Sequence, residues 1–400
     1  MDRIAIVGAG QAGAALAAAL RASGFSGRLT LIGDEPAPPY QRPPLSKAYL
    51  KGELTRERLF LRPARFWAEQ EIALCTGAAV LAIDRTARTV QLADGAIGYD
   101  ALALTTGSRP RRLPAAIGGD LPGVHVIRGL GDIDALAPAI RPGRRLLVVG
   151  GGYIGLEAAA VARERGLSVT LVEAAPRILG RVAAAETAAW FADLHRSRGV
   201  DLRVGIGIGR LTGTDRLTGA VLTDGTGIAA DLAVVGIGIA PETRLAEAAG
   251  LACEGGIVVD AHGRTSDPAI WAAGDCAALP FRGGRLRLES VQNAIDGAEA
   301  VARNMLGADA PYAPQPWFWS DQYDVKLQIA GLGGGASNVV VRNGPEGRSH
   351  WYFGAGGLCA VDAINAPRAF MTAKRLLAAG VSPDPARVGD PATDLRALGP

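Results

Sequence analysis

Residues 146–173 read LLVVGGGYIGLEAAAVARERGLSVTLVE, and this segment has the pattern of a strand, a glycine-rich turn, a helix and a second strand. An apolar run opens the segment at 146–149, and a second apolar run lies at 168–172. Residues 154–165, between the two runs, are expected to form a helix. The order predicts a βαβ unit with its glycines between the first strand and the helix.

Three glycines of this segment, Gly150, Gly152 and Gly155, have the spacing GxGxxG. One such glycine makes the tight turn, one lets the backbone approach a pyrophosphate, and one lets the helix pack against the strand. The pyrophosphate then lies on the free N–H groups at the helix start. Glu173 ends the second strand, where its carboxylate can accept hydrogen bonds from a ribose 2′-hydroxyl and would repel a 2′-phosphate. The segment therefore predicts a site for NAD rather than NADP.

The N-terminal residues repeat the same pattern. A strand is expected at 3–7, a helix at 12–23 and a strand at 29–32, which Asp34 and Glu35 follow. The GxGxxG glycines of this repeat are Gly8, Gly10 and Gly13. A glycine-rich turn that binds nothing is the alternative interpretation. Two complete repeats favour two dinucleotides, and a nicotinamide with a flavin is the pair that would exchange electrons.

Composition excludes several classes of protein. A length of 400 residues predicts two or three domains. The net charge of +3 is too small to indicate nucleic-acid binding, and no apolar run reaches the ~18 residues of a membrane span. The four cysteines show no CxxC or zinc spacing, so no metal site is expected. The first strand begins near Arg3, which leaves no room for a signal peptide. A cytoplasmic protein without nucleic-acid or membrane partners is expected.

The remaining segments complete an α/β pattern. Residues 36–51 are rich in proline, and they form either a surface loop or a segment whose Arg42 and Lys47 meet the phosphates or the ring of a bound nucleotide. A helix is expected from about Leu45, and Trp317–Trp319 begin a different pattern, typical of a small α+β domain. Further strands are expected at 72–76, 79–84, 89–92, 101–106, 200–204, 217–222, 231–235, 257–259, 270–273, 325–330, 338–341 and 358–364, and further helices at 291–305 and 367–379.

Several motifs resemble those of the two-dinucleotide flavoprotein reductases. They are the two glycine motifs, LTTG at 104–107, GIG at 236–238, IWAAGD at 270–275 and the domain order. PYQRPPLSKAYL at 39–50, RLESVQNA at 287–294 and PWFWSDQY at 316–323 are similar to the NADH-dependent ferredoxin reductases of bacterial oxygenase systems. The resemblance covers essentially the whole chain.

The resemblance implies a fold class and domain boundaries. The fold class is α/β, with two Rossmann-like dinucleotide-binding domains of the glutathione-reductase type and a small α+β C-terminal domain. The expected boundaries are 1–107 with 243–314 for a discontinuous FAD-binding domain, 108–242 for an NAD-binding domain and 315–400 for the C-terminal domain. One departure from the family pattern is LTTG in place of ATG, and another is Arg42, which not every relative has.

The resemblance also implies site residues. Those expected to contact FAD are Gly8, Gly10, Ala12, Gly13, Asp34, Glu35, Arg42, Lys47, Val80, Thr106, Gly107, Arg128, Gly274, Asp275, Val291 and Trp319. Those expected to contact NAD are Gly150, Gly152, Tyr153, Ile154, Gly155, Glu157, Glu173, Arg181 and Gly238. Lys47, Glu157 and Trp319 are the expected catalytic residues, with Lys47 and Glu157 meeting near the reactive edge of the flavin. For the tryptophan, a place in a core aromatic cluster is the alternative.

The implied activity is that of an FAD-dependent NADH:ferredoxin oxidoreductase. Hydride transfer from a nicotinamide to a flavin needs positioning rather than a general acid, so none is named. No cysteine pair lies at 42–47, which argues against thiol–disulfide chemistry. The expected partner is a transiently bound [2Fe–2S] ferredoxin that feeds an oxygenase, steered by arginines such as Arg65 and Arg42. A monomer or weak homodimer is expected. A flavoprotein that acts by redox-controlled partner binding, as apoptosis-inducing factor does, and an NADH oxidase or peroxidase are the alternatives.

Overall fold

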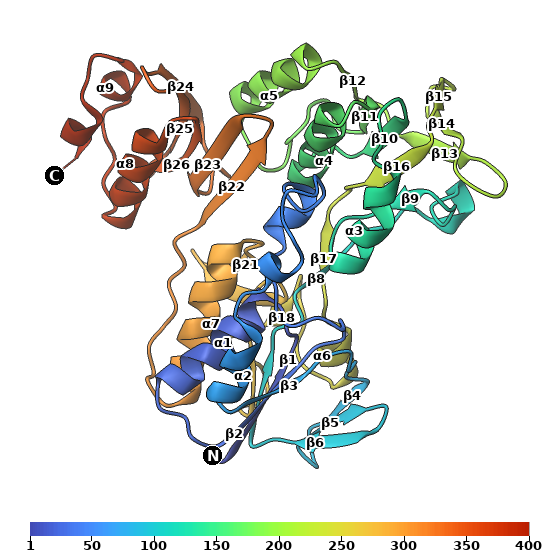
Figure 1. The fold of residues 1–400 in the computed structure, drawn as a ribbon. Helices are drawn as coiled ribbons and strands as arrows, with labels where there is room; N and C mark the ends of the chain where they lie inside the picture. Colours follow the sequence, from blue (N-terminus) through green and yellow to red (C-terminus); the bar gives the residue numbers. More distant parts are fainter. Residues whose placement is uncertain (400) are drawn as a thin grey trace. The chain divides into compact units, whose positions relative to one another are not determined.

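The computed structural model describes residues 1–399, which form two compact units. The first unit contains residues 1–42, 55–109 and 239–316. The second contains residues 43–54, residues 110–238 and the chain from Trp317 to the end of the described residues. Figure 1 labels most of the helices and strands of both units. Each unit contains one of the two glycine-rich turns, and the domain boundaries expected from the sequence stay a prediction.

A parallel five-stranded sheet with the order β19-β7-β1-β2-β3 forms the centre of the first unit. Both of its faces are buried. Ile4 and Ile6 of β1 pack on one side, and Ala5 and Val7 pack on the other. Burial on both sides explains why these strands are continuous apolar runs. The strands are β1 Arg3–Val7, β2 Arg28–Ile32, β3 Ile72–Cys75, β7 Ala101–Leu104 and β19 Ile270–Ala272.

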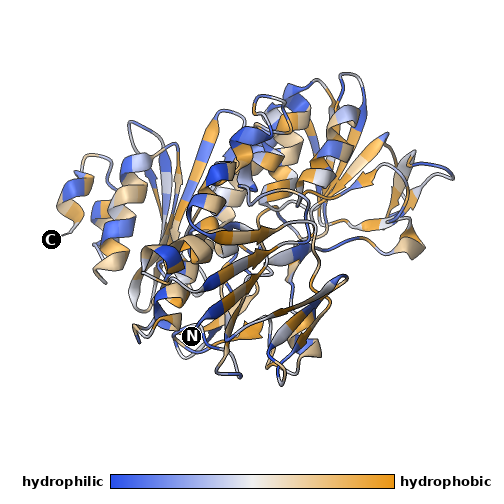
Figure 2. Ribbon diagram, turned by 60° about the horizontal axis from the view of Figure 1, so that its bottom comes forward, coloured by the Kyte–Doolittle hydropathy of each residue, from blue (hydrophilic) through white to orange (hydrophobic). Residues whose placement is uncertain are grey.

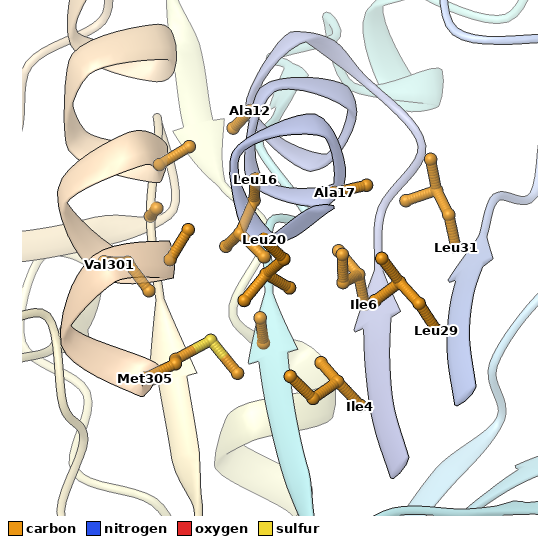
Figure 3. Packing of buried hydrophobic residues seen from close by; sticks show 14 of the residues in the cluster. Ile4, Ile6, Ala12, Leu16, Ala17, Leu20, Leu29, Leu31, Val301 and Met305 are labelled. Atoms are coloured by element: carbon orange, nitrogen blue, oxygen red, sulfur yellow. The ribbon is translucent and has the colours of Figure 1, made fainter. Parts of the chain in front are cut away.

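Two helices, α1 (Gln11–Ala22) and α7 (Val291–Met305), cover one face of this sheet. Figure 3 shows Leu16 and Leu20 of α1 between Ile4 on the sheet and Met305 on α7. Each such buried side chain stabilises the fold by about 1.5–3 kcal/mol. The other elements of this unit are η2 Glu57–Leu59, α2 Ala64–Glu69, β4 Ala82–Asp84, β5 Thr89–Leu92, β6 Gly95–Gly98, β8 Ser108–Pro110, β17 Ile239–Pro241, α6 Arg244–Ala248, β18 Ile257–Val258, β20 Ala277–Phe281 and β21 Gly284–Leu286.

The second unit repeats the parallel arrangement with the order β12-β11-β10-β16-β9. Helix α4 (Tyr153–Glu164) follows the glycine turn after β10. The sheet strands are β9 Val124–His125, β10 Arg145–Val149, β11 Ser168–Glu173, β12 Val200–Val204 and β16 Leu232–Val235. The other elements of this part are η1 Pro43–Ser46, η3 Ala115–Ile117, α3 Leu130–Leu136, η4 Ala137–Ala139, α5 Ala185–Ser197, β13 Ile208–Thr212, β14 Gly219–Leu222 and β15 Gly227–Ala229.

The second unit also contains an antiparallel sheet with the order β22-β23-β26-β25-β24. Helix α8 (Pro367–Ala378) packs on it through Phe370 and Leu376, against Trp351 and Val361. The helices next to the C-terminus show both hydrophilic and hydrophobic bands in Figure 2, as expected for helices that bury one side. The strands are β22 Trp317–Gln322, β23 Val325–Gly331, β24 Asn338–Asn343, β25 Arg348–Gly354 and β26 Gly357–Ile364, followed after α8 by α9 Pro385–Gly389 and η5 Leu395–Leu398.

The predicted fold class is confirmed, with differences in detail. The helix expected from Leu45 is a 3-10 turn over Pro43–Ser46, closed by a hydrogen bond from the N–H of Lys47 to the carbonyl of Pro44. The sequence pattern predicts no element at α5 or β25. Both elements bury polar residues, Thr187 on α5 and His350 on β25, and these interrupt the apolar periodicity.

Candidate functional site

In the glycine turn of the first unit, the surrounding backbone leaves no room for a side chain at two glycines and leaves room at the third. Gly8 has φ +113°, and a Cβ built on it would lie 2.2 Å from the carbonyl oxygen of Thr105. A Cβ on Gly13 would lie 2.0 Å from the carbonyl oxygen of Gly8. Among the described residues, a Cβ on Gly10 would meet no atom of a neighbouring segment within 4 Å. Gly10 therefore leaves a space beside the backbone that suits a bound pyrophosphate.

The second unit shows the same division at the matching positions. Gly150 has φ +105°, and its Cβ would lie 2.4 Å from the carbonyl oxygen of Gly236. A Cβ on Gly155 would lie 2.1 Å from the carbonyl oxygen of Gly150. The nearest atom to a Cβ on Gly152 is the carbonyl oxygen of Gly236 at 4.0 Å. The same glycine of each GxGxxG motif is thus the one that faces open space.

The helices after both turns begin without a side-chain cap. Gly10 and Gly152 are the N-cap residues of α1 and α4, and neither helix has an acidic residue in its first turn. By contrast, Ser290 caps α7 by accepting a hydrogen bond from the N–H of Asn293. Uncapped N–H groups at a helix start attract anions such as phosphate. Both turns therefore fit the diphosphate of a dinucleotide.

The two acids after β2 differ in their surroundings. Glu35 accepts hydrogen bonds from Nη2 of Arg42, at 2.6 Å, and from the hydroxyl of Tyr40. Burial opposes the charge of Arg42, but Tyr40 and Glu35 outweigh it and raise the pKa of the guanidinium. Asp34 is exposed at the end of the strand. Asp34 is therefore the more accessible of the two acids, and the predicted contacts of Asp34 and Glu35 with a ribose stay predictions.

The IWAAGD motif lies against the start of α1. Gly274 has φ +80°, and a Cβ on it would lie 3.0 Å from the Cβ of Ala12, so both the backbone conformation and the close approach favour glycine. Oδ2 of Asp275 accepts a hydrogen bond of 2.8 Å from Ser108. Four other residues expected to contact FAD lie in this unit. Thr106 and Gly107 lie in the loop after β7, Val80 lies in the loop before β4, and Val291 is the first residue of α7.

The motif LTTG carries a hydrogen bond that the sequence comparison with ATG does not suggest. The hydroxyl of Thr105 donates to the carbonyl of Gly8 at 2.8 Å. The hydroxyl of Thr106 donates to the carbonyl of Glu242 at 2.6 Å. The change from alanine to threonine therefore ties β7 to the glycine turn.

Glu173 supports the glycine turn of the second unit. Its carboxylate accepts hydrogen bonds of 2.7 Å from the N–H of Gly151 and of 2.7 Å from the N–H of Ala175. An ionised carboxylate has about four acceptor positions, so two of them are left for a ribose. Its predicted contact with the ribose stays a prediction.

Several other residues expected to contact NAD surround the same turn. Ile154 is 41% exposed at the start of α4. Arg181 is exposed, and its Nη2 would lie 3.1 Å from a Cβ on Gly238. Arg128, which was expected to contact FAD, also lies in the second unit, just before α3, where its backbone N–H donates to Asp132. Its contact with FAD stays a prediction.

Tyr153, the first residue of α4, stacks on Phe318 of β22 with 4.7 Å between the ring centroids. Its buried hydroxyl has no hydrogen-bond partner among the described residues. Burial and the nearby Asp362 raise the pKa of this phenol well above its usual value. The hydroxyl is therefore a neutral group that can still donate to a ligand.

Lys47 and Glu157 form an ion pair in the second unit. Nζ of Lys47 lies 2.8 Å from Oε2 of Glu157, whose side chain is 2% exposed. Two serine hydroxyls also donate to this carboxylate, Ser46 to Oε2 at 2.5 Å and Ser320 to Oε1 at 2.6 Å. The predicted contact between Lys47 and Glu157 is present. The two serines are absent from the sequence prediction.

Lys51 makes a similar contact about two helical turns further along α4, with Glu164 at 2.6 Å. Segment 43–54 therefore lies along α4 and is fixed to it by two ion pairs. Glu157 lies one turn inside the helix rather than at its start, and this position explains its burial.

Trp319 lies in an aromatic group on β22. Its ring centroid is 5.6 Å from that of Trp317, which in turn contacts Phe370 and Nζ of Lys374. Trp319 itself is partly exposed. Part of its surface is thus available to a ligand, and its role at a flavin stays a prediction.

The cysteines, the possible metal ligands and the helix lengths of the described residues can be stated directly. All four cysteines are free, and none lies in segment 42–47. Residues 1–399 contain no group of three or more His, Cys, Asp or Glu that could hold a metal ion. No helix within the described chain has both the length and the apolar character that a membrane crossing requires.

Comparison with known families agrees with this geometry. Residues 2–298 match the family described as pyridine nucleotide-disulphide oxidoreductase. This chain belongs to that family. Its members use FAD and NAD(P)H, in keeping with the two open glycine turns. Residues 317–399 match a second family, described as reductase C-terminal.

Individual relatives within the family cover the chain almost completely. Rhodocoxin reductase of Rhodococcus erythropolis is 45% identical over 399 residues, which are 98% of this chain and 93% of the relative. A ferredoxin–NAD(P)⁺ reductase of a Sphingomonas species is 46% identical over 389 residues, 94% of this chain and 92% of the relative. The crystal structure of the covalent putidaredoxin reductase–putidaredoxin complex matches with a TM-score of 0.95 and 40% identity, covering 99% of this chain and 98% of the reductase. These relatives support the ferredoxin reductase interpretation and neither alternative.

Proposed function

We propose that this protein is an FAD-dependent NADH:ferredoxin oxidoreductase that delivers electrons from NADH to a [2Fe–2S] ferredoxin serving an oxygenase. Two uncapped glycine turns of matching geometry, one in each unit, carry this proposal, together with the full-length similarity to ferredoxin reductases. FAD held by this protein would supply the chemistry that links a two-electron hydride donor to an acceptor of single electrons. The protein holds the two cofactors and orients them.

Each unit has its own part in this function. The first unit binds FAD at Gly10, with Asp34 toward the ribose and Asp275 at the flavin side. The second unit binds NADH at Gly152, with Glu173 toward the ribose of the nicotinamide cofactor. Lys47, Glu157 and Trp319 act at the reacting end of the cofactors. The ion pair of 2.8 Å and the partial exposure of Trp319 support this assignment.

The acceptor takes electrons singly, since no cysteine pair is present to accept two. A [2Fe–2S] cluster held by cysteines of a separate small protein is such an acceptor. Ferredoxins are usually acidic, and four exposed arginines lie close together in the sequence around η2 and α2, namely Arg56, Arg58, Arg62 and Arg65. Arg42 is less suited to docking because it is paired with Glu35 and its side chain is 29% exposed.

The complex with ferredoxin is small and transient, as electron-transfer encounters usually are. The protein works in the cytoplasm as a monomer or weak homodimer. The experiment is NADH-driven reduction of cytochrome c by the FAD-loaded protein, with and without a ferredoxin from the same genome. Strong stimulation by the ferredoxin is expected. Rapid turnover of peroxide or dithiols without any stimulation by ferredoxin would contradict the proposal.

A further inference from the structure

Strand β22 lies along helix α4 with its side chains in matching register. Phe318, Ser320 and Gln322 lie on one face of the strand, because every second side chain points to the same face. Phe318 stacks on Tyr153, and Ser320 donates to Glu157 four residues further along α4. Two strand residues span about 6.6 Å, and four helix residues span about 6 Å. The two spacings agree, so both contacts form at once.

The third side chain of this face extends the contact to α5. Nε2 of His195 lies 2.8 Å from Oε1 of Gln322, and Nε2 of Gln322 donates to Oγ of Ser320 at 3.2 Å. Nδ1 of His195 lies 3.3 Å from the hydroxyl of Tyr323. Ser320, Gln322 and His195 are each 0% exposed.

The hydrogen bonds that link these side chains to Glu157 all run in the same direction. Glu157 accepts from the hydroxyl of Ser320, so the oxygen of Ser320 is free to accept from the amide of Gln322. The amide oxygen of Gln322 then accepts from N–H at Nε2 of His195, and Nδ1 of His195 accepts from Tyr323. Burial lowers the pKa of His195, which keeps this neutral form. Every donor in the series therefore points toward the carboxylate of Glu157.

The turn between β22 and β23 has two residues, and such hairpin turns commonly need a positive φ at their first residue. Tyr323 has φ +56°, which is uncommon for a bulky side chain. Its ring packs on His195 at 5.2 Å and under the guanidinium of Arg198 at 5.1 Å. These two contacts hold the ring of Tyr323, the residue directly after Gln322, against the C-terminal end of α5.

We propose that Ser320 is a positioning residue for the reductase reaction, acting through Glu157, with Gln322 and His195 holding its hydroxyl in place. Ser46 and Lys47 bind Oε2 of Glu157, whereas Ser320 binds Oε1. Ser320 therefore fixes the rotation of the carboxylate, and the carboxylate fixes the position of the Lys47 ammonium. The C-terminal sheet is in this way a part of the catalytic apparatus. This inference rests on the proposed function.

The first measurement is the rate of flavin reduction by NADH under single-turnover conditions, over a range of NADH concentrations. Ser320→Ala should lower the limiting rate about tenfold, equivalent to ~1.4 kcal/mol in the activation free energy, with little change in the NADH dissociation constant. Ser320→Thr keeps the hydroxyl and should restore most of the rate. Ser349→Ala is the matched control, because Ser349 is 1% exposed in the same sheet and accepts from Trp351 instead of contacting Glu157.

The second measurement does not depend on activity. The variants Ser320→Ala, Glu157→Gln and the double variant form a thermodynamic cycle for denaturant unfolding. A non-additive cycle is expected, whereas the cycle of Ser349→Ala with Glu157→Gln should be additive. If Ser320→Ala fails to fold, Ser46→Ala tests the same carboxylate from its other oxygen, and it should also lower the limiting rate.

The outcomes separate this inference from the proposed function. A wild-type protein whose flavin NADH does not reduce would refute the proposed function. A wild-type protein that is reduced, with Ser320→Ala reduced at the same rate or with an additive Ser320–Glu157 cycle, would overturn the positioning role alone. Equal slowing in Ser349→Ala would also overturn it, because the effect would then be one of general stability.

Discussion

At the scale of single residues, Glu157 is a buried carboxylate with three donors. Removal of one partner from a buried ion pair commonly costs ~3–5 kcal/mol, because a charge is left unpaired. Ser46 and Ser320 still donate to Glu157 when Lys47 is absent. We therefore expect Lys47→Ala to lower the free energy of unfolding by only about 1–3 kcal/mol and to slow flavin reduction by NADH.

Chemical denaturation and single-turnover reduction measure these two effects of Lys47→Ala. Lys51→Ala is the control, because the side chains of Lys51 and Glu164 are 23% and 36% exposed. Such exposed pairs contribute about 0–1 kcal/mol. Equal effects of the two substitutions on the rate would contradict a role for Lys47 in the reaction.

Glu173 should determine the choice between NADH and NADPH. The loss of a hydrogen bond to a charged group costs ~1.5–3 kcal/mol, and a 2′-phosphate beside the carboxylate adds repulsion. We expect Glu173→Gln to lower the ratio of kcat/KM for NADH to that for NADPH by about ten- to a hundredfold. Asp201→Asn, on the neighbouring strand, should leave the ratio unchanged. A wild-type enzyme with equal kcat/KM values for both cofactors would refute the role of Glu173.

At the scale of elements, the two strand–turn–helix units predict paired outcomes for their glycines. Gly8→Ala and Gly150→Ala place a Cβ 2.2 Å and 2.4 Å from backbone carbonyl oxygens, so both should destabilise the fold strongly. Gly10→Ala and Gly152→Ala meet open space and should leave the melting temperature nearly unchanged. Gly10→Ala should instead weaken FAD retention, and Gly152→Ala should raise KM for NADH. Unchanged cofactor binding in both variants would contradict the assigned sites.

The contact between α5 and the C-terminal sheet contains two buried groups whose pKa values move in opposite directions. Thr187 donates to Oδ2 of Asp362 at 2.6 Å and lies 2.6 Å from Nδ1 of His350. Burial raises the pKa of Asp362 to about 6, and burial together with Arg348 lowers the pKa of His350 to about 4.

These shifts have opposite effects on stability between about pH 4 and pH 6. In this window the native state holds a proton on Asp362 that the unfolded state, with a pKa of ~3.9, has lost, so the contribution of Asp362 falls as pH rises. For His350 the unfolded state, with a pKa of ~6.5, holds the proton that the native state lacks, so its contribution rises with pH. The two slopes oppose each other in the wild type.

Single substitutions should reveal how each of the two groups changes the free energy of unfolding with pH. Relative to wild type, the free energy of unfolding of Asp362→Asn should increase with pH from 4 to 6, and that of His350→Gln should decrease, each by roughly 1.4 kcal/mol per pH unit. Denaturant unfolding over this pH range measures both. Asp324→Asn, whose side chain is 74% exposed, is the control and should run parallel to wild type. Slopes of the same sign in the two variants would contradict the assignment.

At the scale of the whole molecule, the net charge of +3 is small, and Arg56, Arg58, Arg62 and Arg65 are exposed near one another in the sequence, where Glu57 and Glu69 offset part of their charge. Charges separated by more than ~8 Å are screened at physiological salt, so the ferredoxin-dependent rate should fall as ionic strength rises. Arg65→Glu should lower this rate at low salt and flatten its salt dependence. Arg396→Glu makes the same charge change at an exposed position of the other unit and should have little effect. A rate that is independent of salt would contradict electrostatic docking.

The amino-acid sequence by itself was sufficient to predict the two glycine motifs, their helices, and the strands β1, β2, β10 and β11. These features are local, because turn geometry and apolar periodicity depend on about 30 consecutive residues. The pairing of Lys47 with Glu157 was also predicted from the sequence, but only through its resemblance to known reductases.

The tertiary structure alone decided which residues surround that pair. Ser46 and Ser320 lie 111 and 163 residues from Glu157 along the chain, and His195 lies 127 residues from Gln322. A buried serine, glutamine or histidine looks like a break in an apolar pattern when the chain is read in order. Its hydrogen-bond partner appears only when a strand of the C-terminal sheet packs along α4, because burial of a polar group is tolerated where a distant segment supplies the missing donor or acceptor.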